Sequence, residues 1–417
     1  MKLNYPKTFV LGFGFFGVSV LWAVYNAFVP IFLKQRFHLE PNVIGFVMTL
    51  DNIAALIIQP YIGALSDRLR TPIGRRMPFI LVGAPIAAVA FALVPAAQAL
   101  PLFIASIGAT LLAMAVFRTP VIALMPDITP SQFRSQANGV INFMGGVGAI
   151  IAFLVGASLY EQDPHLPFWV GAVLVLVASA LLLLFVREPK EYAAVPEKEA
   201  GVLHNLRVIA ADRDRSALYL LLAIFFWFVG YNAIEAFFTL YGTTHLGLTE
   251  AEAARQLGDL SLLFVLAAIP SGLLAARIGR RVTIAMGIVL LGSLILAIFF
   301  LPSAVLTVVL TKLPLLGSVR IISLLLMVAG IAWALININS LPMVLDAAPQ
   351  DRLGTYTGLY YFSSTLAAIA GPNAFGWLIK LTGNNYNSIM LGAPVFMFVA
   401  LACMWGVRRG EAKTTAP

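Results

Sequence analysis

Long apolar runs separated by short polar stretches dominate this chain of 417 residues. A helix needs roughly 20 residues to cross the ~30 Å hydrocarbon core of a bilayer, and these runs are of that length. Runs so long and continuous predict helices, because the strands of a membrane barrel alternate over about ten residues. We therefore expect an all-α membrane protein with twelve transmembrane helices, near 8–33, 42–66, 77–97, 100–125, 136–160, 165–187, 216–243, 256–277, 282–302, 319–345, 353–380 and 388–408.

The composition agrees with a surface that is covered by lipid. Hydrophobic residues make up 60% of the chain and charged residues 11%, whereas about a quarter of the residues of a soluble protein are charged. The net charge of +8 comes mainly from lysines and arginines that fall on one side of the membrane if both termini are cytoplasmic. This distribution is the positive-inside bias, so it predicts orientation and not a nucleic-acid partner. We expect a monomer in the plasma (inner) membrane with cytoplasmic N- and C-termini.

A polar stretch at 188–215 divides the twelve runs into six and six. We interpret 1–187 as an N-terminal six-helix bundle, 188–215 as a cytoplasmic linker and 216–417 as a C-terminal six-helix bundle. Short segments recur in the same order in both halves: Tyr-Asn-Ala at 25–27 and 231–233, Gly-Arg-Arg at 74–76 and 279–281, and an aspartate at 127 and 346. Two repeated halves that close on a midplane site are typical of transporters that work by alternating access.

Two segments resemble a known family. The stretch 63–80, GALSDRLRTPIGRRMPFI, resembles the helix 2–3 signature of the major facilitator superfamily. Its long spacer and its ending are similar to the sucrose-transporter-like branch, which is related to the glycoside–pentoside–hexuronide symporters. The stretch 117–138 is similar to the helix 4–5 segment of that branch, and Leu-Asp-Asn at 50–52 looks like its bacterial members. The resemblance implies the major facilitator fold and the uptake of a sugar or glycoside, such as sucrose or maltose, with a proton as coupling ion and no other cofactor.

The sequence departs from the resembled families at two places. Plant sucrose carriers have an aspartate eleven residues before the arginine that matches Arg118, and Ile107 stands there. The identity of the proton carrier therefore stays open. The sodium-using melibiose permease has an aspartate pair in its second helix, and these positions fall at Ala55 and Gln59. This second difference argues against a sodium site of that type.

Three ionisable residues fall inside the predicted helices: Asp51, Arg118 and Glu235. Such groups are costly in hydrocarbon and usually face the interior of the bundle. Asp51 and Arg118 each lie roughly 14 Å from one end of their helices, which places both near the midplane. Our hypothesis is that Asp51 carries the proton and is released from Arg118 when it is protonated, with Glu235 as the second candidate. The alternative is a permanent ion pair that only holds two helices in register.

Aromatic and amide side chains that share helix faces indicate a sugar site. Rings stack on the C–H faces of a sugar, and its hydroxyls need donors and acceptors together. Trp227, Tyr231 and Glu235 recur at i, i+4 and i+8 on one helix face. The full set of expected substrate-binding residues is Trp22, Tyr25, Asn26, Gln59, Trp227, Tyr231, Asn232, Trp333 and Asn337. The alternatives are interfacial anchoring for the aromatic residues and helix–helix hydrogen bonding for Gln59 and Asn337.

Charged residues after the second and fourth helices indicate a gate. Asp67 ends the second helix, on the same side as the start of the eleventh helix near Leu353, where the helix dipole favours a carboxylate. The resemblance implies a cytoplasmic gate made of Asp67, Arg68, Gly74, Arg75, Arg76, Asp127 and Arg134. The alternative is that these charges only set the orientation, and this alternative accounts well enough for Arg70, Arg280 and Arg281.

Other function classes have less support. The four histidines, His38, His165, His204 and His245, fall outside the predicted helices, and none lies near another. Metal-spaced clusters and nucleophile motifs are absent from the sequence, so we expect neither an enzyme nor a metal site. The remaining alternative is a proton-coupled exporter or antiporter of another small molecule on the same fold, although the fifth helix lacks the Gly-Pro element typical of those antiporters.

Overall fold

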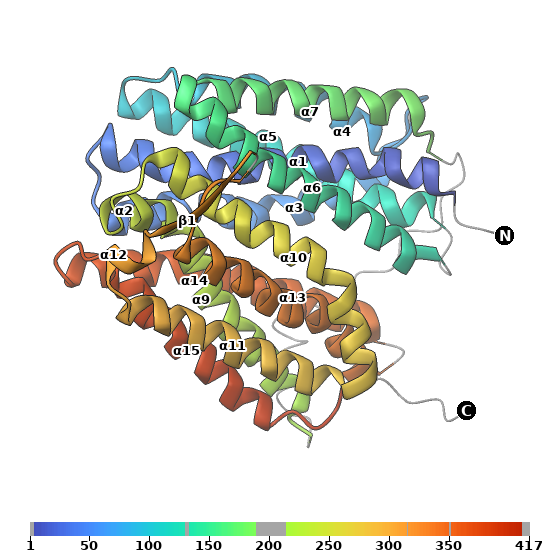
Figure 1. Cartoon of the computed structure of the whole chain (residues 1–417). Helices are drawn as coiled ribbons and strands as arrows, with labels where there is room; N and C mark the ends of the chain where they lie inside the picture. Colours follow the sequence, from blue (N-terminus) through green and yellow to red (C-terminus); the bar gives the residue numbers. More distant parts are fainter. Residues whose placement is uncertain (1–3, 130–132, 189–213, 315, 350–351, 411–417) are drawn as a thin grey trace. The chain divides into compact units, whose positions relative to one another are not determined.

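The computed structural model describes residues 4–129, 133–188, 214–314, 316–349 and 352–410 (Figure 1). The predicted linker 188–215 lies almost wholly outside these residues. The helices are α1 (Tyr5–Gln35), α2 (Pro41–Val47), α3 (Leu50–Arg68), α4 (Met77–Leu93), α5 (Leu100–Ile128), α6 (Arg134–Gln162), α7 (Leu166–Phe185), α9 (Ser216–Thr244), α10 (Glu250–Ile278), α11 (Arg280–Phe300), α12 (Ser303–Leu306), α13 (Ile321–Ala347), α14 (Leu353–Leu381) and α15 (Ser388–Trp405). A hairpin of β1 (Val309–Leu313) and β2 (Gly317–Arg320) lies between α12 and α13.

The helices confirm the predicted fold class. Among the described residues, ten segments are long and apolar enough to cross a membrane, counting α2 and α3 together. The shorter apolar helix α4 and the 29-residue helix α14 occupy the two remaining predicted runs, 77–97 and 353–380. The helices therefore form because apolar runs of this length must satisfy every backbone polar group internally once they are in lipid.

Two local features differ from the sequence-based expectation. The run 42–66 is not one helix, because the helical pattern stops at Val47 and resumes at Leu50. The hydroxyl of Thr49 donates to the Phe46 carbonyl at 2.8 Å, a local side-chain bond that competes with the helical ladder. The β1–β2 hairpin was also not predicted, and the side chains of β1 are exposed throughout. Both features interrupt or connect helices and leave the helical class unchanged.

Contacts along the chain divide it into two compact units. Unit 1 comprises Met1–Leu39, Leu50–Val195 and Glu250–Gly258, and unit 2 comprises Glu40–Thr49, Pro196–Thr249 and Asp259–Pro417. Most of unit 1 precedes the predicted linker and most of unit 2 follows it. Two short segments belong to the unit opposite to the one expected from their place in the sequence. The helix α2 belongs to unit 2, and the first nine residues of α10 belong to unit 1. Nothing in the sequence predicted that these two segments would be exchanged between the units.

In unit 1, α1 packs against α6 and α7. Phe28 of α1 stacks on Tyr160 of α6 with ring centroids 4.4 Å apart and an interplanar angle of 5°. A Cβ atom on Gly148 would lie 2.6 Å from the Phe16 carbonyl oxygen, so the absence of a side chain there lets the two helices approach closely. These contacts hold α1, which carries Trp22, Tyr25 and Asn26, in a fixed register.

In unit 2, α9 packs against α14 and α15. A Cβ atom on Gly371 of α14 would lie 2.5 Å from the Val229 carbonyl oxygen of α9. The exchanged helix α2 packs on α14 in the same manner, because a Cβ on Gly376 would lie 2.6 Å from the Pro41 carbonyl oxygen. Small residues therefore set the spacing of α14 from α9, which carries Tyr231.

Candidate functional site

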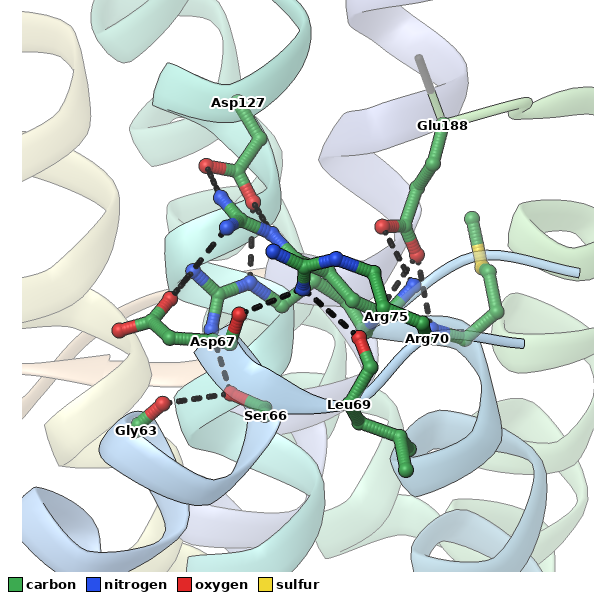
Figure 2. A network of polar contacts seen from close by, with 10 residues as sticks. Gly63, Ser66, Asp67, Leu69, Arg70, Arg75, Asp127 and Glu188 are labelled. Atoms are coloured by element: carbon green, nitrogen blue, oxygen red, sulfur yellow. Dashed lines mark hydrogen bonds and ion pairs between the residues drawn. The ribbon is translucent and has the colours of Figure 1, made fainter. Parts of the chain in front are cut away.

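A network of ion pairs surrounds the loop between α3 and α4 in unit 1 (Figure 2). Arg75 Nη2 donates to Asp127 Oδ1 at 2.6 Å, and Arg76 Nε donates to Asp127 Oδ2 at 2.9 Å. Arg76 also pairs with Asp67, and Arg75 Nη1 lies 3.8 Å from the same carboxylate. Both arginines are buried, so each guanidinium is held between carboxylates from α3 and α5. Paired in this way, the charges tie three consecutive elements together.

Glu188, just after α7, binds the other side of this loop (Figure 2). Its carboxylate accepts the backbone N–H groups of Arg75 at 3.0 Å and of Arg76 and Met77 at 2.9 Å. These N–H groups lie at the N-terminus of α4, where the helix dipole favours a negative charge. Gly74, with φ +119°, turns the chain toward Glu188. Sequence analysis missed Glu188, because a carboxylate at the end of an apolar run looked like the start of the linker.

The structure brings together five of the seven predicted gate residues: Asp67, Gly74, Arg75, Arg76 and Asp127. Arg68 lies outside this network, and its part in a gate stays a prediction. Its side chain is exposed and takes no part in the network formed by the described residues. It follows Asp67 directly on α3, so its side chain points about 100° away around the helix. Arg134 begins α6, and its side chain lies outside the described part of the chain.

Unit 2 repeats part of this network. Gly279 adopts φ +93°, as Gly74 adopts φ +119°. Arg280 pairs with Asp346 and donates to the Pro342 carbonyl at 2.9 Å, and Arg281 donates to the last carbonyls of α15. The sequence repeat therefore corresponds to a structural repeat. A purely orienting role for Arg280 and Arg281 is an incomplete interpretation, because both bind defined groups.

The predicted proton-coupling pair of unit 1 lies together. Asp51 is in the first turn of α3, and Arg118 of α5 is close enough to act on its carboxylate electrostatically. The Asn52 amide donates to Asp51 Oδ1 at 2.8 Å. Tyr25 of α1 also lies close enough to Asp51 for the charge of the carboxylate to act on its hydroxyl group. Asp51 and Arg118 are both partly exposed in this conformation.

The other predicted residues of unit 1 lie on α1 and α3. Trp22 and Tyr25 meet edge to face with ring centroids 5.7 Å apart. Tyr25 is only 1% exposed, whereas Trp22, Asn26 and Gln59 are partly exposed. Among the described residues, neither the Tyr25 hydroxyl nor the Trp22 indole N–H has a hydrogen-bond partner. Buried polar atoms without partners are rare, so these two groups have bonding capacity left for a ligand or water.

In unit 2, Tyr231 and Trp333 form a stacked pair. Their ring centroids lie 3.8 Å apart with an interplanar angle of 4°. Glu235 lies close enough to Tyr231 for its carboxylate charge to act on the hydroxyl group of that tyrosine. Tyr231, Glu235 and Asn337 are partly exposed, so an aromatic face, a carboxylate and an amide are accessible on α9 and α13. Asn232 is also partly exposed, and its amide donates to the Phe228 carbonyl one turn earlier at 2.7 Å.

Trp227 is not accessible in this conformation, unlike Tyr231 and Glu235, and its part in substrate binding stays a prediction. Its side chain is 0% exposed. The helix α9 packs against both α14 and α15, so the indole one turn before Tyr231 is enclosed by helix packing, and its N–H has no hydrogen-bond partner among the described residues. The helical spacing of Trp227, Tyr231 and Glu235 described a common face correctly but did not tell where along α9 that face becomes covered.

Asp259 of α10 is a further carboxylate that sequence analysis overlooked. The predicted run began at residue 256, which placed Asp259 at its edge, but α10 begins at Glu250. The charged first turn, with Glu250 and Glu252, concealed the helix start, although acidic residues there agree with the helix dipole. Among the described residues, no three histidines, cysteines or carboxylates lie together in a group that could hold a metal ion.

Comparisons with known proteins place the chain in a family. It is 28% identical to the tetracycline resistance protein, class H, of Pasteurella multocida over 61% of this chain and 63% of that protein. It is 21% identical to the isoprimeverose transporter of Lactiplantibacillus pentosus over 67% of this chain and 62% of that one. The chain thus spans a little under two thirds of the length of these relatives. A variant of the nucleoside transporter NupG shares the fold with a TM-score of 0.75 at 14% identity, over 96% of this chain and 100% of that one.

The sequence profile of the Major Facilitator Superfamily matches residues 11–372. The match covers most of the chain, and a family of transporters agrees with the prediction that the protein is not an enzyme. With this profile and the all-helical fold together, the chain belongs to the Major Facilitator Superfamily.

Proposed function

We propose that this transporter takes up a sugar or glycoside, such as the disaccharides sucrose or maltose, together with a proton by alternating access. We place it in the sucrose-transporter-like branch of the superfamily. We also propose that it is a monomer in the plasma membrane with its N- and C-termini in the cytoplasm, as the distribution of lysine and arginine suggests.

The observation that carries the sugar assignment is the accessible set on α9 and α13. Tyr231 stacks on Trp333, which holds the exposed ring rigid and offers a flat apolar face. Glu235 and Asn337 supply an acceptor and an amide that both accepts and donates. Small-molecule sites combine aromatic surface with a few such polar groups. The similarity to an isoprimeverose transporter supports the same substrate class.

Proton coupling rests on the Asp51–Arg118 pair. With Asp51 ionised, its charge and that of Arg118 compensate each other across α3 and α5. Protonation removes the negative charge and leaves Arg118 without that compensation, so the preferred arrangement of the two helices changes. Glu235 remains the second candidate for the carrier, because it is partly exposed beside Tyr231.

Asp51→Asn tests the carrier directly. The amide has the shape of the protonated carboxyl but cannot release a proton. We expect cells with this variant to lose protonophore-sensitive accumulation of a radiolabelled sugar, while exchange of sugar across the membrane continues. Asp163→Asn is the matched control, because Asp163 is exposed on the connection between α6 and α7. Uphill accumulation by Asp51→Asn at the wild-type level would refute this role of Asp51.

A proton-coupled exporter or antiporter of another small molecule is the second candidate function. It is favoured by the similarity to a tetracycline resistance protein. Uptake measured at acid outer pH across a panel of labelled disaccharides, monosaccharides and tetracycline separates the two. A protonophore lowers the internal concentration of the substrate of a symporter and raises that of an exporter. A rise for tetracycline with no sugar accumulated would refute the sugar assignment.

A further inference from the structure

Asp259 is a carboxylate buried inside a membrane-spanning helix. It is 1% exposed and lies nine residues after the start of α10, which is roughly 14 Å along the helix axis. Within unit 2, the Leu260 carbonyl beside it lies against Gly330 of α13, where no side chain intervenes. The carboxylate is therefore enclosed where α10 and α13 pack closely.

The hydrogen bonds of Asp259 leave one oxygen unsatisfied. The hydroxyl of Ser323, in the first turn of α13, donates to the carboxylate. The same hydroxyl oxygen accepts the backbone N–H of Arg320 at 3.0 Å. Oδ1 of Asp259 has no hydrogen-bond partner among the described residues. One oxygen of the carboxylate is thus bound and the other is open to a proton.

No charged group of the described chain compensates Asp259. Among the described residues, its partner is the neutral Ser323 hydroxyl. Arg320, just before α13, directs its guanidinium to the Thr307 carbonyl at 2.9 Å. Arg255, one turn earlier on α10, pairs with Glu161 at 2.8 Å. Gln256, also on α10 and buried, is neutral.

The burial of Asp259 makes its ionised form costly. An ionised carboxylate enclosed without a cation costs several kcal/mol, even after the protein relaxes. A protonated carboxyl avoids this cost and keeps the hydrogen bond that Ser323 provides. Asp51 differs, because it has both Arg118 and the Asn52 amide as partners. Of these two aspartates, Asp259 has the surroundings that favour a bound proton.

We propose that Asp259 holds a proton on Oδ1 in this conformation and is a second proton-coupling site, which releases the proton when α10 separates from α13. The coupling half of this proposal rests on the proposed proton-driven function. The position suits such a role, because Asp259 lies within unit 2 where α10 packs closely on α13.

Infrared spectroscopy of the purified full-length protein in lipid nanodiscs tests the bound proton without any substrate. A protonated carboxyl has a C=O stretching band that shifts when the sample is transferred to D2O. We expect this band at neutral pH in the wild type, in Asp51→Asn and in the control Asp163→Asn, and its loss in Asp259→Asn. Ser323→Ala should shift the band, because the C=O loses its donor. The absence of the band in the wild type, or its full retention in Asp259→Asn, would overturn the proposal.

Transport measurements test whether Asp259 takes part in proton coupling. In proteoliposomes with the sugar identified by the uptake panel, we expect Asp259→Asn to exchange sugar but not to accumulate it, so that inner and outer concentrations become equal. Asp259→Glu keeps an acid at this position, and we expect it to retain both the infrared band and part of the accumulation. Wild-type accumulation by a correctly folded Asp259→Asn would overturn the coupling role. If the wild type shows the band but no proton-driven transport, the proposed function fails while the bound proton of Asp259 stands.

Discussion

The contact between Gly74 and Glu188 allows a sharp test of the loop that joins α3 and α4. Gly74 adopts φ +119°, a conformation that residues with a side chain rarely adopt. A Cβ atom there would also lie 2.5 Å from both Cδ and Oε1 of Glu188. Gly74→Ala therefore imposes two separate penalties, one from the backbone and one from displacement of the Glu188 carboxylate.

The two penalties have different magnitudes. The strained backbone costs of the order of 1–3 kcal/mol. Displacing Glu188 weakens three hydrogen bonds from the N-terminus of α4, each worth about 1.5–3 kcal/mol when the acceptor is charged. The Glu188 side chain is flexible and retains part of these bonds, so we expect a total of roughly 3–5 kcal/mol. Gly383→Ala is the matched control, because Gly383 has φ +74° and open space around its Cβ position.

The assay is thermal unfolding of the purified protein in detergent, as a double-mutant cycle with Glu188→Ala. We expect Gly74→Ala to lower the Tm roughly two- to threefold more than Gly383→Ala does. In the Glu188→Ala background, the clash is gone, so Gly74→Ala should cost no more than the backbone penalty. If Gly74→Ala lowers the Tm equally in both backgrounds, the effects are additive and Glu188 does not act through Gly74.

Two further predictions concern helix packing and pH. Gly330→Ala should destabilise the protein by about 1–3 kcal/mol, because its Cβ would meet the Leu260 backbone; Gly358→Ala on α14, with nothing within 4 Å, should raise the Tm slightly. The Ser216 hydroxyl and N–H hold the pKa of Asp214 below its ordinary value, so this stabilisation is present above about pH 4 and is lost as the pH falls through the lowered pKa. The Tm difference between the wild type and Ser216→Ala should therefore be constant above about pH 5 and shrink as the pH falls below about 4, and a difference that does not shrink there would contradict this linkage.

The sequence alone determined the helical class and the location of the spans. Lipid offers no hydrogen bonds to the backbone, so an apolar run of about 20 residues has few alternatives to a helix. The ion-pair network around Arg75 and Arg76 could also be predicted, because Asp67, the two arginines and Asp127 lie in recognisable motifs and opposite charges in apolar surroundings pair with each other. The repeat predicted that Arg280 and Asp346 would correspond to Arg75 and Asp127, and the structure pairs both sets.

Tertiary packing alone decided which side chains are covered and which groups meet across the chain. Trp227 and Tyr231 have the same helical phase and similar chemistry, but one is enclosed and the other accessible. Glu188 acquires its role from N–H groups more than a hundred residues away, and Asp259 is isolated because α13 packs over it. Local periodicity reports which face of a helix a residue occupies, but burial and pairing depend on neighbouring helices that are distant in sequence.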